Sequence, residues 1–232
     1  MFAVDLHSHT RFFHGFGPRP TVYDPLGARL NGAVARLEGL DGLASTNHDY
    51  CWTLPHSALT TIPGIEISTT RGHVLVVGPD PPAGTNSGQL TPAEAVQLAH
   101  DRGCAAIMAH PYRNGTLPDS SASFDAVEIN GKQLEHHADV EALARQRDLP
   151  MVGGSDAHYP FELGRAFTRI DAPRFTPESV VEAIRDGRVE PAVKKRPIDE
   201  ILRPVYARIH RWKARRASKS NAPADDPTEL SG

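Results

Sequence analysis

The chain has 232 residues, of which 39% are hydrophobic. This length and composition fit one globular domain that can bury a core. Its two cysteines, Cys51 and Cys104, exclude a disulfide scaffold and match no zinc-finger or CxxC spacing. Because no apolar run approaches the roughly 18 residues that span a bilayer, and the N-terminus lacks a signal-peptide layout, we expect a cytoplasmic protein with no membrane span.

The net charge of -3 is unevenly distributed along the chain. Residues 1–193 carry 15 Lys and Arg against 23 Asp and Glu, whereas residues 194–219 carry 10 against 2. We therefore predict a folded domain over 1–193, a basic helical extension over 194–219 and a disordered tail over 220–232. The extension could contact an anionic partner, but this pattern does not require nucleic acid.

Short β-rich runs alternate with helical patterns, which predicts βα units and a parallel sheet. The predicted strands are residues 3–7, 43–47, 62–68, 73–78, 105–110, 126–130, 151–155 and 167–170. Predicted helices cover 24–38, 91–103 and 176–187. The second of these has the clearest start, because Thr91, Pro92 and Glu94 match a capping box with proline at the first helical position.

Histidines and acidic residues gather where these strands end. The residues concerned are His7, His9, Asn47, His48, Asp49, Glu66, His110, Asp156 and His158, with His73 at the start of the fourth strand. In a barrel of parallel strands, the loops beyond the carboxyl ends converge on one mouth, where active sites are built. We therefore expect these side chains to meet in one cleft.

Two pairs of these residues have the spacing of metal chelators. Residues two apart on a strand point to the same face, so His7 and His9 can bind one ion, and Asp156 and His158 form a second such pair. A lone buried histidine is more often a hydrogen-bonded core residue than a ligand. Two pairs, both at predicted strand ends, favour a metal site.

An ordered set of motifs resembles the PHP (polymerase and histidinol phosphatase) superfamily. The motifs are "DLHSHT", "GLASTNHD", "PGIEIS", "HVLVVG", "AHP" and "GGSDAH", in this order. The resemblance covers residues 1–193. It implies an α/β fold, a distorted (β/α)7 TIM-like barrel in a single domain, with up to three metal ions in its mouth and hydrolysis of phosphate esters.

The resemblance also implies which residues hold each ion. A first metal would be bound by His7, His9, Glu66 and Asp156. Glu66 would bridge to a second metal, completed by His73 and His110. A third would take His14, His48 and His158. Asn47 stands where the common pattern has Asp, and loss of that acid beside His48 would weaken the third site, because outer-shell partners set the tautomer of a ligating imidazole.

Imidazole and carboxylate ligands without thiolate suit Zn, Mn or Fe(II), so we expect two or three divalent ions of one of these types. Ions of this kind lower the pKa of a shared water toward about 7, and we expect the resulting hydroxide to attack phosphorus. Glu66 would shape the cluster as a bridging ligand. Asp156 or His158 would assist in proton transfer.

Four cationic residues near the motifs are candidates for binding the substrate's phosphate. They are Arg11, Arg71, Arg113 and Lys132. Guanidinium forks match phosphate oxygens, although arginines at such positions can also simply face solvent. The chain has no "GxxxxGK" or "GxGxxG" loop, which argues against a bound nucleotide cofactor.

Together these features predict a metal-dependent phosphoesterase that hydrolyses a small phosphorylated metabolite or nucleotide, with monoesters preferred. One alternative is a hydrolase of a non-phosphate bond, such as an amidohydrolase-like enzyme. Another is a non-catalytic regulatory barrel that binds through its basic extension. The motifs themselves do not identify the ester, the metal or the oligomeric state.

Overall fold

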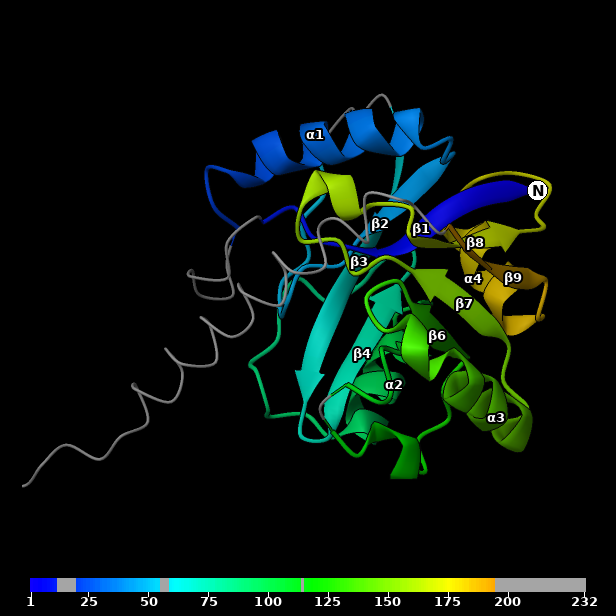
Figure 1. Ribbon diagram of the computed structural model, residues 1–232. Coiled ribbons are helices and arrows are strands. Elements are labelled where there is room, and N and C mark those ends of the chain that lie inside the picture. Colours follow the sequence, from blue (N-terminus) through cyan, green and yellow to red (C-terminus); the bar gives the residue numbers. More distant parts are fainter. Residues whose placement is uncertain (12–19, 55–58, 114, 195–232) are drawn as a thin grey trace, which may run out of the picture. The chain divides into compact units, whose positions relative to one another are not determined.

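The computed structural model describes residues 1–11, 20–54, 59–113 and 115–194 (Figure 1). His14 and the predicted tail lie outside the described residues, as does the predicted extension except for Lys194. Within the described part, no helix has both the length and the apolar character needed to cross a bilayer.

The described strands form one sheet that curls into a nearly closed barrel (Figure 1). In chain order they are β1 (Phe2–Ser8), β2 (Gly42–Ser45), β3 (Thr60–Thr69), β4 (Gly72–Val77), β5 (Ala105–Met108), β6 (Ala126–Asn130), β7 (Met151–Gly154), β8 (Ala166–Ile170) and β9 (Val189–Val193). Their order across the sheet is β7-β6-β5-β4-β3-β2-β1-β8-β9. β7 and the segment after it also contact strands from the other end of this order, namely β1 and β8. The His9 N–H donates to the Ala157 carbonyl at 2.9 Å, and the Gly153 N–H donates to Thr168 Oγ1 at 2.9 Å. The predicted α/β barrel is confirmed.

The predicted parallel sheet is wrong for two strands. β4 runs antiparallel to β3 and β5, and β8 runs antiparallel to β1 and β9. Only Thr70 and Arg71 connect β3 to β4, and a parallel pair needs a much longer crossover. The amino end of β4 therefore lies at the rim where its neighbours have their carboxyl ends. The prediction omitted β9, whose Glu190 and Pro191 break the apolar pattern of a buried strand.

The described residues form four α-helices that pack against the sheet: α1 (Asp24–Leu37), α2 (Pro92–Asp101), α3 (His137–Arg147) and α4 (Pro177–Arg185) (Figure 1). α1, α2 and α4 confirm the three helices predicted from their start signals. In α2, Thr91 and Glu94 form the expected reciprocal cap. In α4, the Thr176 hydroxyl accepts the Ser179 N–H at 3.2 Å.

Strand alternation divides the core into two main parts. Ile65, Ile67 and Val127 belong to the cluster that includes apolar residues of α2 and α3. Inward-facing strand residues such as Leu75 and Ile107 instead share a cluster with the apolar side of α4, which contacts both β5 and β8. α4 therefore packs against the barrel interior. Each of these fully buried aliphatic side chains contributes about 1.5–3 kcal/mol.

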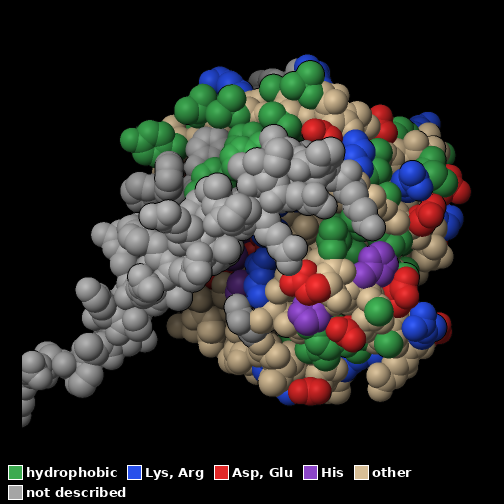
Figure 2. Space-filling model, in the orientation of Figure 1, with side chains coloured by type: hydrophobic (Ala, Val, Ile, Leu, Met, Phe, Trp, Pro, Cys, Tyr) green, Lys and Arg blue, Asp and Glu red, His purple; other side chains and the backbone are tan. Residues whose placement is uncertain are grey.

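α1 places one side against the mouth and exposes the other. On the face drawn in Figure 2, hydrophobic side chains gather over α1, where Tyr23, Leu26 and Leu37 are 57%, 52% and 86% exposed. On the buried side, the Asn31 amide donates to the His9 carbonyl at 2.9 Å. A Cβ at Gly27 would lie 1.8 Å from the Thr10 carbonyl oxygen, so only glycine permits this close approach.

Candidate metal centre

Residues from six strands or the loops after them converge at one rim of the barrel. His7 lies in β1 and His9 just beyond it; His48 follows β2; Glu66 lies in β3 and His73 in β4; His110 follows β5, and Asp156 and His158 follow β7. The described part of the chain thus brings together eight of the nine predicted ligand residues. The ninth, His14, lies outside the described residues.

Four buried donor atoms form the heart of this cluster. His7 Nε2 and His9 Nε2 lie 3.3 and 3.4 Å from Glu66 Oε2, and 3.7 and 3.4 Å from Asp156 Oδ1. All four side chains are at most 2% exposed. Among the described residues, none of these four atoms makes a hydrogen bond of good geometry, although Glu66 Oε2 lies 3.0 Å from His48 Nδ1.

These distances fit a bound cation. Ligand atoms 2.0–2.1 Å from a tetrahedral ion lie about 3.3–3.4 Å from one another. Buried polar atoms normally have hydrogen-bond partners, since an unsatisfied group costs about 1–3 kcal/mol. A cation at the centre of the four donors would satisfy them together, so the donor set fits a divalent ion.

Glu66 extends the cluster to a second group of histidines. Its Oε1 atom lies 2.6 Å from His73 Nδ1 and 3.0 Å from His110 Nε2. Its Oε2 atom, which faces the first group, also lies 3.0 Å from His48 Nδ1. One fully buried carboxylate thus faces two sets of imidazoles, as a ligand shared between two ions would.

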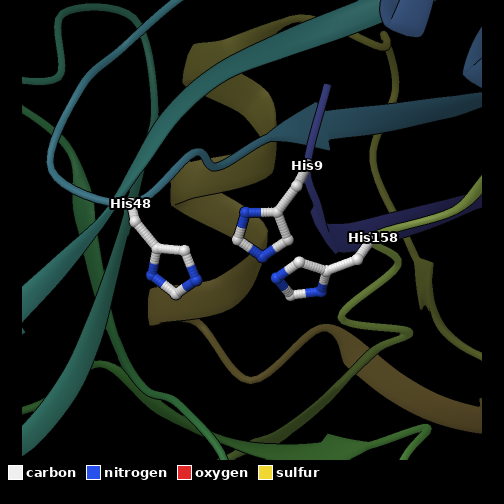
Figure 3. Close-up of side chains that lie close together, drawn as sticks. All are labelled: His9, His48 and His158. Carbon is white, nitrogen blue, oxygen red and sulfur yellow. The ribbon is translucent and has the colours of Figure 1, made fainter. Parts of the chain in front are cut away.

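A third group of donors consists of His9, His48 and His158, whose rings lie together in Figure 3. The ring of His9 is 4.1 Å from that of His158 and 4.7 Å from that of His48, measured between centroids. Asn47 is directed at Thr10, whose backbone N–H donates to its Oδ1 at 2.9 Å. Asn47, which stands where the common pattern has Asp, therefore accepts a hydrogen bond from the backbone next to His9.

Burial and mutual proximity set the charges of this cluster. Burial alone would raise the pKa of Glu66, but His48, His73 and His7 hold it well below its usual range. Burial lowers the pKa of His9, and the nearby His158 lowers it further. Burial likewise lowers the pKa of His48 to about 4. At neutral pH, Glu66 is therefore an anion and His9 and His48 are neutral, which are the forms that bind metal.

Two of the predicted ligand residues have unusual backbones. His110 has φ = 25° and Asp156 has φ = 54°, in the left-handed region that is costly for residues other than glycine. Such strain persists only where the surrounding structure holds it, and it is concentrated at functional sites. Here the strained backbone turns two side chains into the mouth directly after β5 and β7.

The four predicted substrate-binding cations differ in their surroundings. Arg113 pairs with Asp156 Oδ2 at 2.5 Å, and Lys132 Nζ lies 2.9 Å from His158 Nδ1 and 3.4 Å from Glu162 Oε2. Both therefore lie in the mouth.

Arg11 and Arg71 have partners outside the metal cluster. Arg11 stacks over the Tyr50 ring, 4.9 Å from its centroid. Arg71 donates to Thr116 Oγ1 at 3.0 Å and lies 3.8 Å from Asp119. Arg71 nevertheless lines a small pocket together with Arg113, His73, His110 and Leu117. Arg71 and Arg113 thus flank His73 and His110, the histidines of the second group.

Two buried acids in the mouth were missed by the sequence reasoning. Glu128, in β6, contacts His7, and Glu162 accepts the backbone N–H of His158 at 2.7 Å. Glu128 could have been found, because a charged residue in the middle of the apolar strand "AVEIN" must have buried partners. Glu162 has no comparable signal, since acidic residues are common in surface loops.

In a comparison with protein families, residues 135–189 match the family described as PHP-associated. This segment includes β7, Asp156, His158 and α4. No match was found among curated proteins.

Several solved structures share the fold at low sequence identity. PsfC from Pseudomonas syringae PB-5123 has a TM-score of 0.68 and 19% identity, over 92% of this chain and 98% of PsfC. A two-domain protein from Bacteroides vulgatus, containing a predicted PHP-like metal-dependent phosphoesterase, has a TM-score of 0.59 and 19% identity, over 89% of this chain and 69% of that protein. Endonuclease Q, in complex with a 27-mer duplex carrying an abasic lesion at the active site, has a TM-score of 0.53 and 17% identity, over 80% of this chain and 56% of the endonuclease.

Proposed function

We propose that this chain is a member of the PHP superfamily and a metal-dependent phosphoesterase. Its motifs, its family match and its fold support this proposal. Its substrate is a small phosphorylated metabolite or nucleotide, and monoesters are preferred. The observation that carries the proposal is the set of four buried, mutually facing donor atoms on His7, His9, Glu66 and Asp156.

The donor set supports two or three divalent ions of Zn, Mn or Fe(II), because it offers imidazole and carboxylate groups without thiolate. His7, His9, Glu66 and Asp156 would hold the first ion, and Glu66, His73 and His110 the second. His48 and His158 would hold a third, together with His9 or with the predicted His14. When bound, such ions supply Lewis acidity, which polarises a phosphoryl oxygen and makes water more acidic.

The remaining chemistry falls to side chains beside the donors. Arg113 is placed to hold phosphate oxygens, because its guanidinium reaches Asp156 and lines the pocket that contains His73 and His110. Lys132 contributes a second positive charge on the opposite side of Asp156. Both cations favour the negative charge that develops on phosphoryl oxygens as the ester bond breaks.

Proton transfer to the leaving group needs a group that can hold a proton near the donors. His158 is placed for this role, because its Nδ1 atom lies 2.9 Å from the Lys132 ammonium and 3.0 Å from the Asp156 backbone carbonyl, so that Nδ1 accepts from Lys132 when it lacks a proton and donates to the carbonyl when it carries one. In the form with two ions, in which His158 binds no metal, the imidazole can thus exchange a proton while its ring position is fixed. Asp156, whose two oxygens face a cation and the imidazoles, orients this group.

The test measures metal content and turnover in the same preparation. Purified protein is expected to bind two or three equivalents of metal and to release phosphate from an aromatic phosphate monoester. The substrate panel includes phosphorylated metabolites, nucleotides and amides. Because Endonuclease Q shares the fold, the panel also includes a duplex with an abasic site. Metal-loaded protein that cleaves only amides, or none of these compounds, would refute the proposal.

A matched pair of variants separates the metal centre from general effects of losing an imidazole. His9→Ala removes a buried donor and should abolish turnover and reduce the bound metal. His100→Ala removes an imidazole that pairs with Asp125 outside the mouth, at 2.9 Å, and should leave both quantities unchanged. Equal losses in the two variants would mean that the cluster around His9 is not the site of hydrolysis.

A further inference from the structure

Glu128 is a fully buried carboxylate that contacts two of the candidate metal ligands at once. Its Oε1 atom lies 2.7 Å from His7 Nδ1. Its Oε2 atom accepts the backbone N–H of His110 at 2.8 Å and the side-chain amide of Asn130 at 3.1 Å. Both oxygens of Glu128 thus have hydrogen-bond partners.

The contact with His7 fixes which ring nitrogen carries the proton. A carboxylate only accepts hydrogen bonds, so His7 must donate from Nδ1–H to Glu128. When the ring binds metal as a neutral imidazole, its lone pair is therefore on Nε2, the atom that lies 3.3 Å from Glu66 Oε2 and 3.7 Å from Asp156 Oδ1. Outer partners of this kind set the tautomer and the orientation of metal-binding histidines.

The contact with His110 holds a strained backbone. His110 has φ = 25°, a value that costs energy for any residue with a Cβ atom. Its N–H would be buried without a partner if Glu128 did not accept it. Glu128 therefore orients His7 through its ring and His110 through its main chain, and these two residues belong to different groups of donors around Glu66.

The contact between Glu128 and His7 depends on the absence of a side chain at position 154. A Cβ added at Gly154 would lie 2.4 Å from Glu128 Oε1 and 2.5 Å from His7 Cβ. Glycine at this position in β7 is what lets the carboxylate and the imidazole meet. β1, β6 and β7 thus contribute one residue each to a compact positioning unit, formed by His7, Glu128 and Gly154.

We infer that Glu128 is a positioning residue of the metal centre: it holds His7 with Nε2 free to bind metal and fixes the backbone that directs His110 to the same centre. The inference rests on the proposed function for the existence of that centre. It assigns a role to a residue that no metal-binding motif in the sequence identifies.

The first measurement uses the wild-type protein loaded with zinc. Nitrogen chemical shifts of the His7 ring, measured by NMR, report which nitrogen carries the proton. The expected result is a proton on Nδ1 at neutral pH. A proton on Nε2 alone would overturn the inference, without reference to any variant.

The second measurement compares the zinc affinity of Glu128→Gln and wild type, by competition with a chelator. An amide has one acceptor and one donor. In one orientation, the NH2 group of the introduced glutamine faces the His110 N–H and the Asn130 amide, which are also donors, so these hydrogen bonds are lost. In the other, the NH2 group faces His7 Nδ1, and the proton of the His7 ring must then lie on Nε2. We expect zinc binding to weaken by about 10- to 100-fold, with a changed His7 ring spectrum.

Two further variants keep the test decisive. Gly154→Ala retains both side chains but separates them, and should weaken zinc binding in the same direction. Asp125→Asn is the matched control, because Asp125 pairs with His100 at 2.9 Å and accepts the Ala106 N–H at 2.7 Å, outside the metal donors. This control should keep the wild-type affinity and His7 spectrum.

The outcomes separate the inference from the proposed function. Wild-type affinity and an unchanged His7 spectrum in folded Glu128→Gln would overturn the inference and leave the phosphoesterase proposal intact. Wild-type protein that binds zinc but hydrolyses no phosphate ester would overturn the proposed function, while the role of Glu128 toward the metal would stand. Equal weakening in Asp125→Asn would show that loss of any buried carboxylate suffices, and would also overturn the inference.

Discussion

Arg113 and Asp156 form an ion pair in which a guanidinium nitrogen lies 2.5 Å from Asp156 Oδ2. The other oxygen, Oδ1, lies 3.4 Å from His9 Nε2. Burial alone would raise the pKa of Asp156, but Lys132 and Arg113 hold it well below its usual range. The carboxylate is therefore ionised, with one oxygen bound to a cation and the other directed at the imidazoles.

Arg113→Met should lower kcat/KM for a phosphate ester by roughly 10- to 100-fold, because a hydrogen bond to a charged group is worth about 1.5–3 kcal/mol. Arg113→Lys should recover only part of the loss, since an ammonium lacks the planar fork. The control is Arg102→Met, which removes an exposed partner of Asp80. Steady-state kinetics of the metal-loaded variants measure the effect; equal activity in Arg113→Met and wild type would contradict the assigned role.

The double variant His7→Ala, His9→Ala should lose metal before it loses its fold. Metal that binds only the folded state raises its stability, and this gain depends on metal concentration. Zinc should therefore raise the Tm of the wild-type protein and raise that of the double variant much less. Thermal unfolding with and without a chelator, together with elemental analysis, measures both effects. An equal rise in Tm in the two proteins would place the bound zinc elsewhere.

Asp24, which is not one of the metal donors, should make the stability of the fold depend on pH. Burial alone would raise its pKa, but hydrogen bonds from Thr10, Thr21 and Tyr50 outweigh burial and lower it. A carboxyl group with a lowered pKa in the folded state stabilises the protein above its unfolded pKa, about 3.9, and this stabilisation is lost as the pH falls through the folded value.

The stability difference between wild type and Asp24→Asn should therefore be full at pH 7 and pH 5 and should shrink below about pH 4. At pH 7 we expect a loss of about 1.5–3 kcal/mol, since the anion accepts several hydrogen bonds. Tyr50→Phe, which removes one donor, should cost about 1 kcal/mol. Urea unfolding with a chelator present measures these values. A difference that does not change with pH would show that the charge of Asp24 is irrelevant.

Ile184 in α4 tests the core that packs inside the barrel. This residue is fully buried, so Ile184→Ala should lower the free energy of unfolding by about 2–5 kcal/mol. Leu37→Ala in α1 is the matched control, because Leu37 is 86% exposed, and its change should stay within about 0.5 kcal/mol. Metal content per folded molecule should be unchanged in both variants. Similar losses of stability at the two positions would contradict the packing of α4.

Much of the fold follows from local patterns in the sequence. Thr91, Pro92 and Glu94 predicted the start of α2, and the apolar runs predicted all strands except β9. The direction of β4 was not predictable from its own residues, because an apolar strand reads the same in a parallel and an antiparallel sheet. It follows from the short link between β3 and β4, because two residues can join an antiparallel pair but not a parallel one.

The sequence by itself determined which residue types could bind metal and where they lie relative to strand ends, because chelating spacing and strand alternation are local properties. The resemblance implied that Glu66 bridges two groups of ligands, but the sequence did not determine that Glu66 also contacts His48, or that Glu128 contacts His7. These relationships join residues up to 121 positions apart. Only the tertiary structure decides them, because closure of the barrel brings strands distant in the chain within hydrogen-bonding distance.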